Sequence, residues 1–458
     1  MDHAARHRGR YRQHARATLT LGLPLVGSQV AQFTIQLTDA LMLGRYSVEA
    51  LAAEVLGGTL FFVLFLMGSG FAAAVMPMVA AAAAAGAPEE LRRVTRMGGW
   101  ASLGFGLAAL PVMLFSEPLL RALGQQADVS AQAARYLHIV GPAIVPALLA
   151  MVLRSFLVAL EHTRAVLWVT LAAVAINAGL NWLLIFGHLG FPEMGLRGAA
   201  VASLAVNVAT LAALAVCAAR VLPEQALFAR LWRCDGAALA RVVRLGWPIG
   251  LTSLAEVSLF AAATVMMGWL GKLPLAAHGI AMQIDSVVFM VYLGLSNAAT
   301  VRAGQAHGRA DAEGLRAGAL VVLAMAGAVA LLVAAVFVTL PETLIALFLD
   351  PGDPDRATVL AVGTGLLAAA ALFQIADAGQ VMALGLLRGV HDTRVPMLIA
   401  ALAYWGFGVP ASYGLGFILG WGGIGVWLGL ALGLGLAAAL LLARFRGRAG
   451  RLAALRPG

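Results

Sequence analysis

The chain has 458 residues, of which 61% are hydrophobic and only 12% are charged, and its mean hydropathy is +0.90. Soluble domains carry about a quarter charged residues, so this composition excludes a soluble fold and indicates an integral membrane protein. The net charge of +9 comes from basic residues in short clusters between apolar stretches, without a recognisable nucleic-acid motif, and so does not indicate nucleic-acid binding.

Several enzyme classes are also excluded by the residues present. The only lysine, Lys272, is followed by Leu273, so the chain has no Walker A loop for ATP hydrolysis. The two cysteines, Cys217 and Cys234, give neither a disulfide framework nor the spacing of metal ligands. We therefore expect a protein that is not an enzyme and carries no cofactor.

Twelve apolar stretches are each long enough to cross a bilayer, which takes about 20 mostly apolar residues in helical form. We predict spanning helices at 17–44, 51–84, 97–115, 131–160, 165–187, 195–222, 241–270, 274–305, 315–341, 357–388, 395–418 and 422–445. The basic segment 1–16 runs straight into the first of them without a small-residue cleavage site, so we expect a retained helix rather than a signal peptide.

The second six helices repeat the first six. The tetrapeptide Leu21–Pro24 recurs as Leu245–Pro248 with Trp247 in place of Leu23, and further short matches follow in the same register. We predict an N-lobe at 17–222, a cytoplasmic linker at 223–240, a C-lobe at 241–445 and a basic tail at 446–458. The expected fold is all-α, with twelve transmembrane helices in two six-helix bundles related by a pseudo-two-fold axis along the membrane normal, as in transporters with parallel repeats.

Basic residues predict the orientation. With this helix order, all but six of the 31 basic residues fall on the side that holds both termini, and the six on the other side are Arg45, Arg121, Arg135, Arg197, Lys272 and Arg356. By the positive-inside rule we expect both termini in the cytoplasm. Arg154 and Arg164, which flank the turn after the fourth helix, are interpreted as anchors on this cytoplasmic side.

A polar stripe runs along the first helix. Its members share one helical face because they are spaced three or four residues apart: Gln29, Gln32, Gln36 and Asp39. The glutamines could bind substrate or hydrogen-bond neighbouring helices, and Asp39 could instead pair with Arg45 near the outer surface. On the fifth helix Asn177 and Asn181 also share a face, and could hold a cation together with Asp39 or join two helices.

Three further acids lie within the C-lobe helices. A charge at a helix centre costs about 2.5–3.5 kcal/mol, so intramembrane acids are functional candidates. Glu256 and Asp377 lie deep, by their distance from flanking arginines, whereas Asp285 could be buried structurally by Ser286 and Gln283. Gln374 lies on the helix of Asp377. We therefore expect asymmetric lobes, with a single acid in the N-lobe and three in the C-lobe.

Four stretches together resemble multidrug and toxic compound extrusion (MATE) transporters of the NorM-like bacterial branch. They are TDALMLGRYSVEALAA, LRSFLVALEHTRAVLWVTLAAVAINAGLNWLLIFG, AAHGIAMQIDSVVFMVYLGLSNAATVRAGQAHG and FQIADAGQVMALGLLRGVHDT, and they span nearly the whole chain. The resemblance implies alternating access and export of cationic amphipathic small molecules, driven by Na+ or H+, by a multi-pass protein of the bacterial inner membrane that we expect to be monomeric.

By motif position, the resemblance implies a coupling role for six residues, with Na+ as one candidate ion: Asp39, Asn177, Asn181, Ser203, Glu256 and Asp377. Residues that could contact substrate are Gln29, Gln32, Gln36, Gln283, Asp285 and Gln374. The rival interpretation is a flippase of the same superfamily for lipid-linked oligosaccharides or peptidoglycan precursors. Its anionic substrate favours a basic cavity, whereas the intramembrane charges here are acidic.

Overall fold

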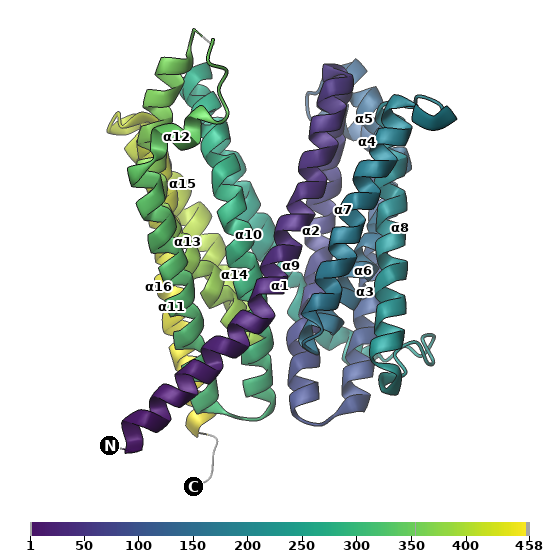
Figure 1. Cartoon of the computed structure of the whole chain (residues 1–458), viewed down its shortest axis with the longest axis vertical. Helices are drawn as coiled ribbons and strands as arrows, with labels where there is room; N and C mark the ends of the chain where they lie inside the picture. The colour runs from purple at the N-terminus through teal and green to yellow at the C-terminus, as the bar shows by residue number, and fades with distance from the viewer. Residues whose placement is uncertain (1, 353, 455–458) are drawn as a thin grey trace. The chain divides into compact units, whose positions relative to one another are not determined.

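The computed structural model describes residues 2–352 and 354–454, and nearly all of them are helical (Figure 1). The elements in order are α1 (Asp2–Tyr46), α2 (Val48–Ala84), α3 (Pro88–Leu114), α4 (Ser116–Ala122), α5 (Ala127–Val140), η1 (Gly141–Ala143), α6 (Ile144–Ala159), α7 (Thr163–Phe186), η2 (His188–Gly190), α8 (Leu196–Val221), η3 (Pro223–Gln225), α9 (Gly236–Leu270), α10 (Lys272–Gly308), α11 (Ala312–Thr339), α12 (Pro341–Ala346), α13 (Arg356–Gly389), α14 (Arg394–Ala401), η4 (Leu402–Gly408), α15 (Val409–Tyr413), η5 (Gly414–Ile418) and α16 (Gly422–Ala454).

Eleven helical segments within the described residues are long and apolar enough to cross a membrane. α1 is a twelfth long helix, but it is not among these segments because its polar stripe lowers its hydropathy. Helices satisfy every backbone polar group internally, which is why apolar stretches of this length become helices in lipid. The all-α membrane fold that the sequence predicts is confirmed.

The ends of the helices differ from the predicted ones at a few places. The expected basic segment 1–16 belongs to α1 from Asp2 onward, and the expected linker 223–240 ends where α9 begins at Gly236. The fourth predicted helix, 131–160, is divided into α5 and α6 by η1, which contains Pro142. Proline lacks the backbone N–H that a continuous helix needs at that point.

The chain forms two compact units. Unit 1 comprises 1–26 and 251–458, and unit 2 comprises 27–250. Each change of unit falls within a continuous helix, two residues after Pro24 in α1 and two residues after Pro248 in α9. These prolines occupy equivalent places in the internal repeat. The predicted lobes, divided at the linker, therefore differ from the units at their edges.

Unit 2 is built around α2, which packs against α3, α5 and α6, while α8 packs against α5, α6 and α7. The first part of α9 approaches α2 very closely because glycines face each other there. A Cβ at Gly250 would lie 2.5 Å from the backbone oxygen of Met67, and one at Gly246 would lie 2.7 Å from the Cα of Phe71. Small residues allow this backbone contact, as is typical of membrane helices.

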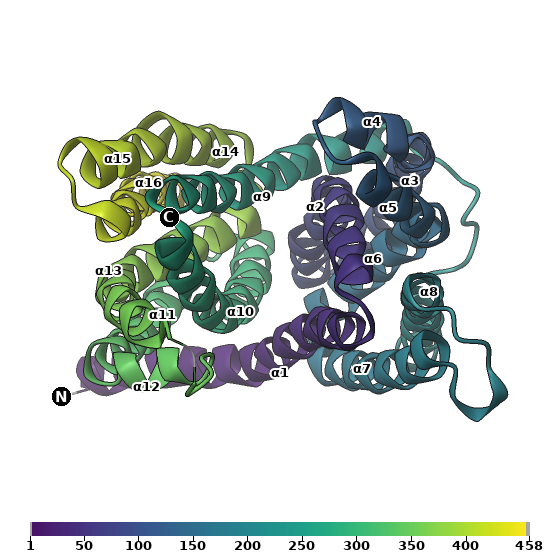
Figure 2. The same ribbon diagram turned by 90° about the horizontal axis from the view of Figure 1, so that it is seen from above.

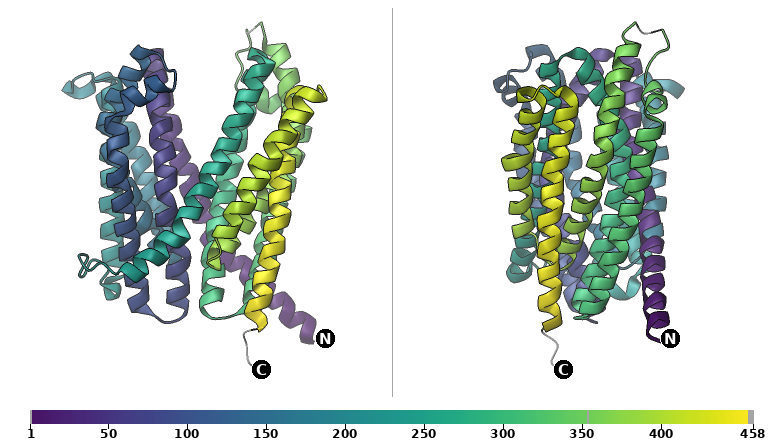
Figure 3. Two further views of the ribbon diagram at one scale, coloured as in Figure 1. Left: turned by 180° about the vertical axis from the view of Figure 1, so that it is seen from behind. Right: turned by 90° about the vertical axis from the view of Figure 1, so that its left-hand side faces the viewer.

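Unit 1 is built around α13, which packs against α10, α11 and α16 (Figures 2 and 3). Its core includes Phe373, Leu387 and Trp427, all fully buried. Segments η4 and η5 are π-helical, a geometry that often occurs at functional sites. α1 begins and α16 ends at the same end of this unit.

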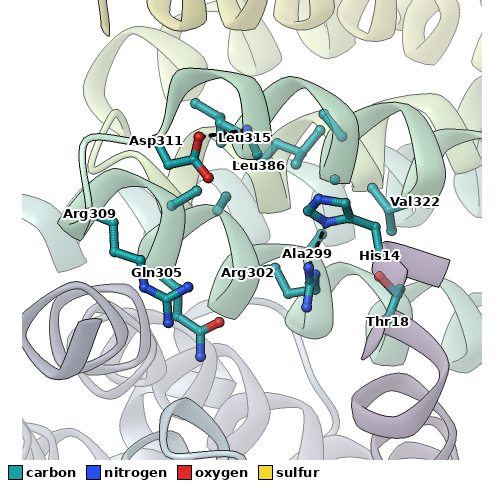
Figure 4. A pocket seen from close by; sticks show the side chains of 15 residues that line it. His14, Thr18, Ala299, Arg302, Gln305, Arg309, Asp311, Leu315, Val322 and Leu386 are labelled. Atoms are coloured by element: carbon teal, nitrogen blue, oxygen red, sulfur yellow. Dashed lines mark hydrogen bonds between the residues drawn. The ribbon is translucent and has the colours of Figure 1, made fainter. Parts of the chain in front are cut away.

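The first part of α1 belongs to unit 1 through polar contacts. Arg10 pairs with Glu313 of α11 at 2.8 Å, and the Arg302 guanidinium of α10 donates to the Nδ1 atom of His14 at 2.6 Å. A pocket lies beside this second contact, lined by His14, Thr18 and residues of α10, α11 and α13 (Figure 4). None of the predicted site residues lines it.

The buried carboxylate of Asp392 links the turn between α13 and α14 to α16 through hydrogen bonds. Asp392, only 4% exposed, accepts hydrogen bonds from Arg444 at 2.8 and 3.1 Å and from Arg448 at 2.6 Å. Burial alone would raise the pKa of Asp392, but the bonds from the two arginines outweigh it and lower the pKa. The contact therefore stabilises unit 1 most when the carboxylate is ionised.

Replacing Asp392 by Asn is expected to destabilise the protein by about 2 kcal/mol at pH 7, because hydrogen bonds between charged groups are lost. The pKa of Asp392 is lower in the folded protein than in the unfolded chain, where it is about 3.9. The carboxylate therefore contributes its full stabilisation above about pH 3.9, and this stabilisation is lost as the pH falls through the folded-state pKa. Thermal unfolding in detergent should show the difference at pH 7 and a smaller one as the pH is lowered below about 4. An equal difference at both pH values would contradict this account.

Candidate functional site

In unit 2 the structure brings Asp39 together with Asn177 and Asn181. The two asparagines lie one helical turn apart on α7 and are fully buried. Both side chains donate to Oδ1 of Asp39, at 2.9 Å from Asn177 and 2.5 Å from Asn181. Asp39 has no ion pair within the described residues, so the alternative pairing with Arg45 is not observed.

Ser203, on α8, contacts a tyrosine that the sequence did not indicate. Its side chain lies beside that of Tyr136 on α5, which is 6% exposed. The Tyr136 side chain packs against α2 at Gly57 and lies within electrostatic range of Asp39. Ser203 therefore belongs to the surroundings of Asp39 through this tyrosine.

Glu54, on α2, is a second acid in unit 2 that the sequence analysis missed. Its carboxylate is partly buried and interacts electrostatically with Asp39. The expectation of a single acid in the N-lobe is therefore wrong. The sequence does contain an indication of this second acid. Ser47 separates the antiparallel helices α1 and α2, and Asp39 and Glu54 lie at nearly equal distances before and after it. The two acids therefore reach similar depths.

Two glutamines of the α1 stripe bind an arginine. Arg154, on α6, donates to Oε1 of Gln29 and to Oε1 of Gln32, each at 2.5 Å. Its guanidinium therefore turns onto α1 within unit 2, a contact that the sequence did not indicate. Gln36 is exposed and makes no hydrogen bond to another described side chain.

In unit 1 the structure joins Glu256 and Asp377 through one amide. The Nε2 atom of Gln380 donates to Oε1 of Glu256 at 2.6 Å and to Oδ1 of Asp377 at 3.3 Å. The Tyr404 hydroxyl, in η4, donates to Oε1 of Gln380 at 2.6 Å and so fixes which way the amide points. Gln380 and Tyr404 are both fully buried, and the cluster links α9, α13 and η4.

Asp285 has a partner other than the expected one. Gln374 of α13 donates to its Oδ1, and both side chains are buried. Ser286 instead donates to a backbone oxygen of its own helix, and Gln283 makes no hydrogen bond to another described side chain. Asp285 also lies within electrostatic range of Asp377, so the acids of unit 1 form one group.

Each unit thus has a cluster of carboxylates whose hydrogen-bond donors are neutral. The acids are Asp39 and Glu54 in unit 2, and Glu256, Asp285 and Asp377 in unit 1. Among the described residues no arginine, lysine or histidine forms an ion pair with any of these five acids, although Arg388 lies within electrostatic range of Glu256. In these two clusters the amide oxygens Oδ1 of Asn181 and Oε1 of Gln374 are buried and accept no hydrogen bond from any described residue. Carboxylate and amide oxygens without a donor are suited to hard cations.

No group of three or more His, Cys, Asp or Glu side chains converges on one point in the part of the chain that the structure describes. A cation at either cluster would therefore be held partly by amide oxygens. Such mixed, weakly charged ligand sets suit an ion that must bind and leave, rather than one that is kept permanently.

Comparisons with known proteins agree on one family. The model of the MatE family matches residues 24–183 and 248–414. The chain is 46% identical over 414 residues to "Probable multidrug resistance protein NorM" of Rhizobium meliloti, covering 90% of this chain and 88% of that protein. A protein of the same name from Agrobacterium fabrum is 44% identical, with 91% and 90% covered.

Solved structures agree at the level of the fold. A MATE protein crystallised in the straight conformation superposes with a TM-score of 0.85 at 20% identity and covers 96% of this chain and 97% of that one. The eukaryotic MATE transporter AtDTX14 gives a TM-score of 0.84 at 18% identity, with 97% and 99% covered. At these identities the likeness concerns the fold alone.

Proposed function

This chain belongs to the MatE family, and from that premise we propose that it is a secondary active antiporter that exports amphipathic organic cations in exchange for Na+ or H+. The chain is a multi-pass membrane transporter of the bacterial MATE type, and the printed names of its relatives indicate multidrug efflux. We further propose a monomer in the bacterial inner membrane, with both termini in the cytoplasm, that works by alternating access.

One observation supports the proposal more than any other. Asp39, Glu256, Asp285 and Asp377 are held by the amides of asparagine or glutamine, which leave the negative charge in place. A buried charge without a counter-ion is costly in a membrane, so an exchangeable cation supplies the missing charge. Alternate neutralisation of the same carboxylates by a small ion and by an organic cation is the basis of an antiport cycle.

The proposed coupling residues divide between the units. Asp39, Asn177 and Asn181, with Ser203 beside Tyr136, form the candidate in unit 2, and Glu256 with Asp377 forms the candidate in unit 1. Both sets offer oxygen ligands suited to Na+ and a carboxylate suited to H+. Gln36, Gln283 and Asp285 are proposed to contact substrate, whereas Gln29, Gln32 and Gln374 are engaged by other side chains in this structure.

A flippase for anionic lipid-linked precursors remains the rival function. It would need several free basic side chains to bind phosphates. In unit 2 Arg154 turns onto α1, where it is bound by Gln29 and Gln32, and in unit 1 Arg388 lies within electrostatic range of Glu256. The excess of carboxylates over such cations favours export of organic cations.

Ethidium uptake into proteoliposomes tests the proposal. Vesicles loaded with Na+, or given an acidic lumen, should accumulate external ethidium, because an antiporter drives substrate toward the side from which the ion leaves. We expect at least one of the two gradients to drive uptake well above the level of vesicles with equal ions on both sides.

Protein-free liposomes under the same gradients give the background, since lipophilic cations respond to membrane potential. The potential is therefore held at zero with valinomycin and equal K+ on both sides. If neither gradient raises ethidium uptake above this background, coupled antiport of organic cations is wrong.

A further inference from the structure

Unit 2 contains a second carboxylate, Glu54, that the proposed coupling set does not use. Its place follows from the packing of the α1–α2 hairpin. Leu43 of α1 and Ala50 of α2 share one buried cluster with Ile185 of α7. Asp39 lies one turn before Leu43, and Glu54 lies one turn after Ala50. Residues four apart share a helical face, so both carboxylates lie on the packed side of the hairpin, at the same depth.

Side-chain contacts agree with this placement. The Glu54 carboxylate lies along α2 toward its C-terminal end, with Oε1 3.3 Å from where a Cβ at Gly58, one turn further on, would lie. Asp39 and Glu54 interact electrostatically with each other, and both interact with Tyr136, the other titratable side chain at this site. Within the described residues Glu54 has neither an ion pair nor a hydrogen bond, so nothing in unit 2 offsets its charge.

A third side chain indicates that a ligand binds beside Asp39. Asn181 is fully buried, and its Nδ2 atom donates to Asp39, but its Oδ1 atom has no hydrogen-bond partner in the part of the chain that the structure describes. Because both atoms belong to one amide, the free oxygen lies beside the Asp39 carboxylate. A buried acceptor without a donor costs about 1–3 kcal/mol, which a bound cation or a proton on the carboxylate would offset.

We propose that Asp39 and Glu54 together form a two-carboxylate site that takes up one monovalent cation, Na+ or H+, for each carboxylate. Unit 2 then couples transport to two ions, where Asp39 alone would couple it to one. The inference rests on the proposed antiport. It makes Glu54 a second ion-binding residue of unit 2 and raises the number of ions exchanged per substrate.

Steady-state accumulation measures the stoichiometry. At zero membrane potential, the logarithm of the substrate ratio across a coupled antiporter rises linearly with the logarithm of the ion ratio, and the slope is the number of ions per substrate. Glu54→Gln should lower that slope by about one and leave transport ion-driven, because Asp39 remains. Glu49→Gln, an exposed acid at the start of the same helix, is the matched control and should keep the wild-type slope.

Direct ion binding separates failure of this inference from failure of the antiport proposal. Purified protein without substrate is assayed for bound ²²Na+ and, separately, for proton uptake on acidification. Glu54→Gln should bind about one ion fewer than wild type in one of the two assays, and Glu54→Asp, which keeps a carboxylate, should bind as many as wild type. Equal binding and equal slope in Glu54→Gln and wild type would overturn the two-carboxylate site, whether or not either gradient drives ethidium.

Discussion

Replacing Asp377 by Asn is expected to lower ion-driven ethidium uptake by on the order of 100-fold, which corresponds to about 2.7 kcal/mol. The figure follows from the cost of about 2.5–3.5 kcal/mol for a charge within the membrane, because the variant no longer holds the charge that the coupling ion neutralises. Asparagine keeps the size of the side chain and an oxygen that can accept from Gln380. The loss should therefore come from the charge and not from the packing.

The same reasoning applies to Asp39→Asn in unit 2, where Asn177 and Asn181 would still have an oxygen to bind. Asp350→Asn, an exposed acid beyond the end of α12, serves as the matched control and should transport like wild type. Initial uptake rates are compared at equal amounts of reconstituted protein. Full activity in both Asp377→Asn and Asp39→Asn would exclude a mechanism based on these carboxylates.

The fold was largely predictable because its determinants are local. Apolar stretches of about 20 residues predict helices in lipid, and the recurrence of Leu21–Pro24 at Leu245–Pro248 predicts the duplication. The shared face of Asn177 and Asn181 on α7 could also be predicted, because residues at i and i+4 lie on one side of a helix. In each case a short stretch of sequence contains the information.

The remaining contacts depend on tertiary structure. Arg154 binds glutamines more than 120 residues away, and nothing near it in the sequence distinguishes it from a surface anchor. Glu54 was missed because the predicted helix began at residue 51, which put this acid in a first turn, where acids are common. The helix begins at Val48 instead, where Ser47 accepts a hydrogen bond from Ala50, and Glu54 therefore lies deeper.

Gln380 shows the same division between local and tertiary information. Its spacing of three residues from Asp377 places both on one face of α13, and this much can be read from the sequence. Its contacts with Glu256 and Tyr404 come from other elements and could not be predicted. The structure thus makes a neutral glutamine the central residue of the acidic cluster in unit 1.

Gln380→Leu is expected to destabilise unit 1 by about 3 kcal/mol, because two buried carboxylates each lose a donor and the Tyr404 hydroxyl loses its acceptor. Leucine has a similar volume, so little of the effect should come from a cavity. Thermal unfolding of the purified protein in detergent, in a buffer without Na+ at pH 8, measures the loss. Tyr404→Phe removes only the hydroxyl that orients the amide, and should cost less.

Ions should restore more stability to Gln380→Leu than to wild type. In wild type the amide hydrogens occupy the carboxylate oxygens that a coupling cation would use, so amide and cation compete. Without the amide, the carboxylates of Glu256 and Asp377 can be satisfied only by a cation or by protonation. An ion that binds only the folded protein stabilises it by about 2.7 kcal/mol at 100 times its dissociation constant.

The unfolding temperature of Gln380→Leu should therefore rise with added Na+ or with a fall in pH, and rise further than that of wild type. The ion that produces the larger rise identifies the one that unit 1 prefers. A variant as stable as wild type in the Na+-free buffer, and no more responsive to either ion, would show that Gln380 does not bridge the two carboxylates. If Gln380→Leu were less stable than wild type but neither ion raised its unfolding temperature further, Gln380 would still bridge the two carboxylates. Glu256 and Asp377 would then not be the site at which a cation replaces the amide.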